Sequence, residues 1–110
     1  SRTALSYLRE KIHQNDENGN ISLGTLDGVD SLIIEQTYHD KIFYTYIYAY
    51  ENALWELMVQ DGIDVSPKDG TKILEVTDLT MEESAKGLFQ FTYTNPEGQI
   101  IRSSVSVLSQ

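Results

Sequence analysis

Residues 41–60 read KIFYTYIYAYENALWELMVQ, and this stretch decides the fold class. Tyrosine occupies every second position from Tyr44 to Tyr50, with β-branched or apolar residues between. A period of two in aromatic and β-branched residues predicts a β-strand with both faces partly covered. The polar pair Glu51 and Asn52 interrupts the alternation, and large apolar residues resume after Ala53. The stretch is therefore predicted to be a β-hairpin that carries most of the large apolar side chains.

A helix is predicted before the strands, in residues 1–13. Leu5, Leu8 and Ile12 form one apolar stripe at helical spacing, and good helix formers surround them. No residue of this segment stands out as an N-cap, so the chain is expected to begin inside a helix and to be cut from a longer protein. Because an isolated helix of this length is only marginally stable in water, its apolar stripe is expected to pack on the sheet.

Alternating patterns continue along the rest of the chain. They predict further strands at residues 21–26, 31–38, 72–80, 87–94 and 99–108, with a polar connection or one helical turn at 81–86. Most connections are short enough for an antiparallel meander. The expected fold is α+β: one domain, residues 1–110, in which the N-terminal helix packs on an antiparallel sheet of about six to seven strands within residues 21–110.

Charge and composition exclude several kinds of partner. Seventeen acidic residues against eight Lys and Arg give a formal net charge of -9, which repels phosphate backbones and anionic lipid surfaces, so we expect no nucleic-acid partner. The absence of cysteine excludes disulfides, thiolate metal sites and Cys nucleophiles. No apolar run reaches the ~18 residues that span a bilayer.

The residue types that usually carry catalysis or metal binding do not form a recognisable set. His13 and His39 have no partner at a ligand spacing. Residues 14–25 imitate part of an EF-hand loop, but Gln14 and Thr25 occupy the two positions that need carboxylates. A hydrolase would need two carboxylates in one cleft, and the sequence brings no such pair together. We therefore expect no enzyme activity, no cofactor and no metal.

The tyrosine ladder is the one candidate contact surface. Alternation places Tyr44, Tyr46, Tyr48 and Tyr50 on one face of a strand. Tyrosine is amphipathic and frequent at interfaces, so this face could anchor another protein or stack on a sugar. The simpler interpretation is that the face lies under the N-terminal helix, or that its hydroxyls reach a wet rim of the core. Exposure of the tyrosines would favour a contact surface.

Three segments carry a resemblance: TALSYLREKIHQND, LDGVDSLIIEQ and TYIYAYENALWEL. Together they resemble an uncharacterised family, a domain of unknown function, of small bacterial proteins from clostridia-like Gram-positive organisms. The layout is also similar to type IV pilin-like and pseudopilin proteins, whose long N-terminal helix continues from a membrane-spanning segment and packs on an antiparallel sheet. No cysteine pair and no pilin-type calcium loop accompany this similarity.

The resemblance implies a non-enzymatic, pseudopilin-like structural or assembly subunit. Its location would be extracytoplasmic, at the cell surface or membrane-anchored through a segment upstream of residue 1. Its partners would be other protein subunits, in a pilus or secretion-type assembly. The alternative is a secreted module that binds carbohydrate or peptide through the tyrosine face.

Overall fold

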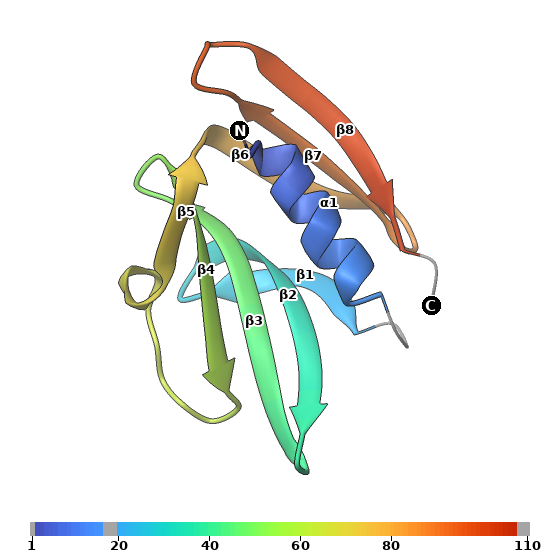
Figure 1. Ribbon diagram of the computed structural model, residues 1–110, viewed down its shortest axis with the longest axis vertical. Helices are drawn as coiled ribbons and strands as arrows, with labels where there is room; N and C mark the ends of the chain where they lie inside the picture. Colours follow the sequence, from blue (N-terminus) through green and yellow to red (C-terminus); the bar gives the residue numbers. More distant parts are fainter. Residues whose placement is uncertain (1, 17–19, 108–110) are drawn as a thin grey trace.

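The computed structural model describes residues 2–16 and 20–107 (Figure 1). These residues form one α-helix, one short 3-10 helix and eight strands in two antiparallel sheets. Strands 1 to 5 form the first sheet and strands 6 to 8 the second, each in sequential order. The elements are α1 (Ala4–Gln14), β1 (Ile21–Leu26), β2 (Val29–Tyr38), β3 (Lys41–Tyr50), β4 (Ala53–Gln60), η1 (Pro67–Asp69), β5 (Thr71–Glu75), β6 (Thr77–Ala85), β7 (Leu88–Thr94) and β8 (Ile100–Ser106).

The expected single sheet of about six to seven strands, with a pseudopilin-like layout, is wrong, because the chain changes sheet at Val76. The predicted strand at 72–80 is divided there into β5 and β6. Asp78, two residues later, has a positive φ of 54°, and the pairing of β6 with β7 shifts between Thr77 and Thr80. The interrupted backbone ends the first sheet and starts the second. The fold is mostly β, not α+β with one helix-covered sheet.

Several other strand boundaries also differ from expectation, most of them by one or two residues; strand β2, predicted at 31–38, begins at Val29. Residues 81–86, predicted as a polar connection or one helical turn, largely belong to β6, which ends at Ala85. The last strand is predicted to span residues 99–108. Strand β8 ends at Ser106, and residue 108 lies outside the described residues.

Two-residue turns bracket β3. His39 and Asp40 join β2 to β3, Glu51 and Asn52 join β3 to β4, and all four residues have positive φ. Such mirror-image turns match the right-handed twist of paired strands and set their register. The hairpin predicted around β3 is therefore present, with Tyr50 opposite Ala53 and Tyr38 opposite Lys41.

Helix α1 begins at Ala4 with an N-cap, contrary to the expectation of a mid-helix start. Thr3 is extended (φ -105°, ψ 161°), and its hydroxyl accepts a hydrogen bond from the Ser6 N–H at 3.0 Å. The Ser6 hydroxyl in turn accepts from the Thr3 N–H at 3.1 Å, which completes a capping box. The helix is 11 residues long, and no helix of the described residues is long and apolar enough to cross a membrane.

One hydrophobic core joins the helix to both sheets, and α1 lies between them (Figure 1). Leu8 and Ile12 of the helix are fully buried. The first sheet contributes Leu32, Ile34, Ile47 and Leu54 to this core, and the second contributes Phe89, Phe91, Tyr93 and Val105. The Tyr93 hydroxyl accepts a hydrogen bond from the Leu5 N–H at 3.1 Å, which fixes the first turn of α1 to the second sheet.

Candidate functional site

The tyrosines of β3 lie on the face of the first sheet that turns away from α1. Ile47, between Tyr46 and Tyr48, is fully buried in the core shared with the helix. Side chains alternate along a strand, so the neighbouring tyrosines project from the opposite face. The structure therefore does not place the tyrosine face under the N-terminal helix. The part of the tyrosine face that is covered lies under the loop between β4 and β5.

The half of this face that carries Tyr48 and Tyr50 is covered at Tyr48, whereas Tyr50 is partly exposed. Tyr48 is fully buried, and its hydroxyl donates a 2.6 Å hydrogen bond to the carbonyl oxygen of Pro67 in η1. Burial, with Asp69 nearby, raises the Tyr48 pKa. Beside it, the Tyr50 ring meets the Trp55 ring edge-on, with 5.6 Å between centroids. The loop between β4 and β5 thus removes the predicted site residue Tyr48 from any contact surface.

The other half of the face is open, and we name it the tyrosine patch. Tyr44 and Tyr46 are partly exposed, and their ring centroids lie 6.2 Å apart with planes tilted by 46°. Partly exposed apolar side chains stand opposite them on the neighbouring strands. The tyrosine patch consists of Ile33 on β2, Tyr44 and Tyr46 on β3, and Leu57 and Val59 on β4.

Two carboxylates stand beside the Tyr44 ring. Glu35 is the direct cross-strand partner of Tyr44, so the two side chains share a face. Asp61 follows β4, and its N–H donates a 2.8 Å hydrogen bond to the carbonyl oxygen of Ile42. Partial desolvation of the Tyr44 hydroxyl, with the charges of Asp61 and Glu35, raises its pKa. Sequence reasoning missed both acids, because each is remote from Tyr44 along the chain.

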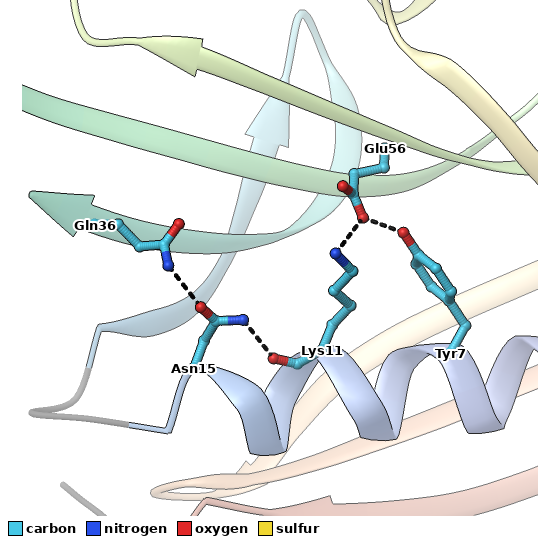
Figure 2. A network of polar contacts seen from close by, with 5 residues as sticks. All are labelled: Tyr7, Lys11, Asn15, Gln36 and Glu56. Carbon is cyan, nitrogen blue, oxygen red and sulfur yellow. Dashed lines mark hydrogen bonds and ion pairs between the residues drawn. The ribbon is translucent and has the colours of Figure 1, made fainter. Parts of the chain in front are cut away.

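A second polar cluster fastens α1 to the inner face of the first sheet, and Figure 2 shows it. The Tyr7 hydroxyl donates a hydrogen bond to Glu56 Oε1, and Lys11 Nζ lies 3.1 Å from the same oxygen. Burial of Tyr7, then its bond to Glu56 and the charge of that carboxylate, raise the Tyr7 pKa. A tyrosine so shifted keeps its proton near neutral pH and cannot act as a base.

The same cluster continues at the end of the helix (Figure 2). Asn15, the C-cap residue of α1, donates from Nδ2 to the Lys11 carbonyl oxygen at 2.8 Å. Its Oδ1 accepts a 2.7 Å hydrogen bond from Gln36 Nε2 on β2. Tyr7 and Lys11 thus hold α1 against β4, and Asn15 both closes the end of the helix and holds it against β2. The role of this cluster is therefore structural: it fixes the position of α1 on the first sheet.

The remaining sequence candidates do not converge on one site. His13 is exposed on α1 and His39 lies in the β2–β3 turn. Across the part of the chain that the structure describes, no group of three or more His, Asp or Glu side chains could hold a metal ion. The EF-hand-like segment includes residues 17–19, which lie outside the described residues. Glu51 lies in the β3–β4 turn, whereas Glu56 is bonded to α1.

Comparison with known proteins gives a family but no activity. No curated protein and no solved structure matches the chain. One family does match: it is described as a domain of unknown function, DUF4860, and it covers residues 1–96. The expected resemblance to an uncharacterised family is confirmed at that level. Because the match spans most of the sequence, this chain belongs to the DUF4860 family.

Proposed function

We propose that this protein is a non-enzymatic structural or assembly subunit that binds another protein through the tyrosine patch. The observation that carries the proposal is the partial exposure of Tyr44 and Tyr46 beside apolar residues of β2 and β4. Aromatic side chains with apolar neighbours are the usual anchors of protein interfaces. The patch lies on a rigid sheet whose other face is fixed to α1, so it is preformed for binding.

The shape of the patch supports a protein partner over the alternative of a carbohydrate. A sugar ring stacks best on flat aromatic surface, whereas the Tyr44 and Tyr46 planes are tilted by 46°. A secreted module that binds an extended peptide in the same place is the second candidate, and it uses the same residues.

The proposed location is extracytoplasmic, at the surface of a Gram-positive bacterium of the clostridial kind. This part of the proposal rests on the sequence resemblance alone. The proposal that the protein belongs to a pilus or secretion-type assembly also rests on the sequence resemblance alone. A subunit of such an assembly need not have the pilin fold. A subunit of any surface assembly needs a partner-binding face, which the tyrosine patch supplies.

The proposal can be tested by site-specific photo-crosslinking in cells that naturally produce the full-length protein. A photoreactive phenylalanine analogue replaces Tyr46, and in the control it replaces Ile100, which is 73% exposed on the second sheet. We expect the probe at position 46 to give a discrete adduct with another surface protein, absent from the control. No adduct, or the same adduct from both positions, would contradict a protein-binding role. An adduct with wall polysaccharide would instead favour the carbohydrate alternative.

A further inference from the structure

The tyrosine patch carries charges that are not compensated within the described part of the protein. Glu35 and Asp61 are exposed, and the ion pair between Lys11 and Glu56 lies on the other face of the sheet. Both carboxylates act on the Tyr44 hydroxyl, Glu35 from β2 and Asp61 from the end of β4. An aromatic ring thus has a carboxylate on each side, in the middle of a partly apolar surface.

This arrangement discriminates among partners. A neutral apolar surface laid over the patch would take both carboxylates out of water without a counter-charge, which is costly. A partner that brings a cation instead would keep the carboxylates paired. It would also gain from the face of the Tyr44 ring, because aromatic faces attract cations.

A second copy of this chain is a poor occupant of the patch. In a two-fold contact the patch of one copy meets the patch of the other, and neither the patch nor its flanking acids Glu35 and Asp61 offer a basic side chain to pair with those carboxylates. Each copy also has a formal net charge of -9, so the general field is repulsive. Charge complementarity therefore points to a different, basic partner.

We propose that the tyrosine patch receives an extended, arginine-bearing segment of a partner protein, with the guanidinium over Tyr44 and between Glu35 and Asp61. Arginine fits better than lysine because its planar group stacks on a ring while it donates hydrogen bonds to carboxylates at its edge. The inference rests on the proposed protein-binding function and names the chemistry of the partner.

The geometry also sets the spacing of the segment. In an extended peptide, alternate side chains on one side are about 6.5 Å apart. The Tyr44 and Tyr46 centroids are 6.2 Å apart, so the residue two positions from the arginine would lie over Tyr46 and Leu57. That residue should be apolar. Tyr48 is covered by η1, so the segment extends no further in that direction.

Isothermal titration calorimetry tests this inference by measuring the affinity of the purified full-length protein for two pentapeptides with blocked termini. One contains arginine and, two positions later, leucine; the other has neutral citrulline in place of arginine. We expect the arginine peptide to bind about tenfold more tightly, with a preference that weakens as salt is added. The double substitution E35Q/D61N should abolish the preference. The matched double substitution E10Q/E82Q removes the same charge from exposed positions elsewhere and should retain the preference.

Each other outcome overturns the inference. Equal binding of both peptides by the wild-type protein would show that no cation is recognised, whether or not the variants fold. Equal losses in both double variants would show a general effect of net charge and no defined site. No binding of either peptide would also reject the arginine segment. In all three cases the crosslinking experiment at position 46 still decides whether the patch binds a protein at all, so the two proposals fail separately.

Discussion

The hydroxyl of Tyr7 on α1 donates its hydrogen bond to the carboxylate of Glu56 on β4, 49 residues away along the chain. The same carboxylate oxygen forms an ion pair with Lys11, one helical turn further on. Tyr7 is only 4% exposed, so its hydroxyl would have little access to water without this partner. The contact therefore sets the position of the helix against the first sheet, which in turn leaves the tyrosine patch as the outer surface.

Replacing Tyr7 with phenylalanine should destabilise the protein. The substitution keeps the ring in the core and removes only the hydroxyl that bonds a charged group, so we expect a loss of about 1.5 kcal/mol in the free energy of unfolding. Urea denaturation followed by circular dichroism measures it. Tyr38→Phe is the control, because Tyr38 is 45% exposed and its hydroxyl makes no hydrogen bond among the described residues. An unchanged Tyr7→Phe stability would mean that the Glu56 contact contributes nothing net.

The raised pKa of Tyr7 predicts a loss of stability at alkaline pH. Below its ordinary value near 10, the tyrosine is protonated in both the folded and the unfolded chain. Above that pH the unfolded chain releases the proton while the folded chain retains it, so the free energy of unfolding falls as pH rises. Tyr48 and Tyr44, whose pKa values are also raised, add to the slope.

The contribution of Tyr7 to the pH dependence of the free energy of unfolding can be measured separately. The wild-type protein is more stable than Tyr7→Phe near neutral pH, and the difference should narrow as pH rises above about 10. Urea titrations between about pH 8 and about pH 11 would reveal it. A difference that stays constant over this range would contradict the raised pKa.

Gly70→Ala should be costly because there is no space for a methyl group at this position. An added Cβ would overlap the Tyr48 hydroxyl and lie 2.9 Å from the Glu56 carbonyl oxygen. We expect a loss of about 2 kcal/mol, as for other overpacked sites. In a Tyr48→Phe background the nearer obstacle is gone, so Gly70→Ala should cost less there. Additive costs in this double-mutant cycle would show that the two residues do not interact.

Much of the fold could be predicted from alternation and turn residues, but the change of sheet could not. The pattern of 72–80 continues through Val76 without a glycine or proline to mark a break. Val76 is 2% exposed, as a residue inside one continuous strand would also be. Strand β6 was missed in part because most of its residues are exposed, so 81–86 looks like a polar connection. Which sheet a strand joins depends on distant partners that local propensity does not contain.

The candidate site could be predicted only in outline for the same reason. Alternation is enough to put the β3 tyrosines on one face. It does not say which face α1 covers, because the other face, with Thr45 and Ile47, is also apolar enough to be a core. Nor does it predict that Pro67 lies over Tyr48, a contact made by a loop that returns across the sheet. The N-cap at Thr3 was missed because its box partner is Ser6 and not the usual Glu or Gln.

The two tight turns around β3 restrict where members of the family can gain or lose residues. Each turn has two residues and fixes the register of a hairpin. One residue inserted into either turn must be absorbed by a wider loop with a bulge, or else it slips the pairing by one position and turns the outward side chains of the displaced strand inward. Insertions and deletions should therefore be rare next to β3. They should collect in the exposed loop from Asp61 to Asp64, where one more residue changes no strand register.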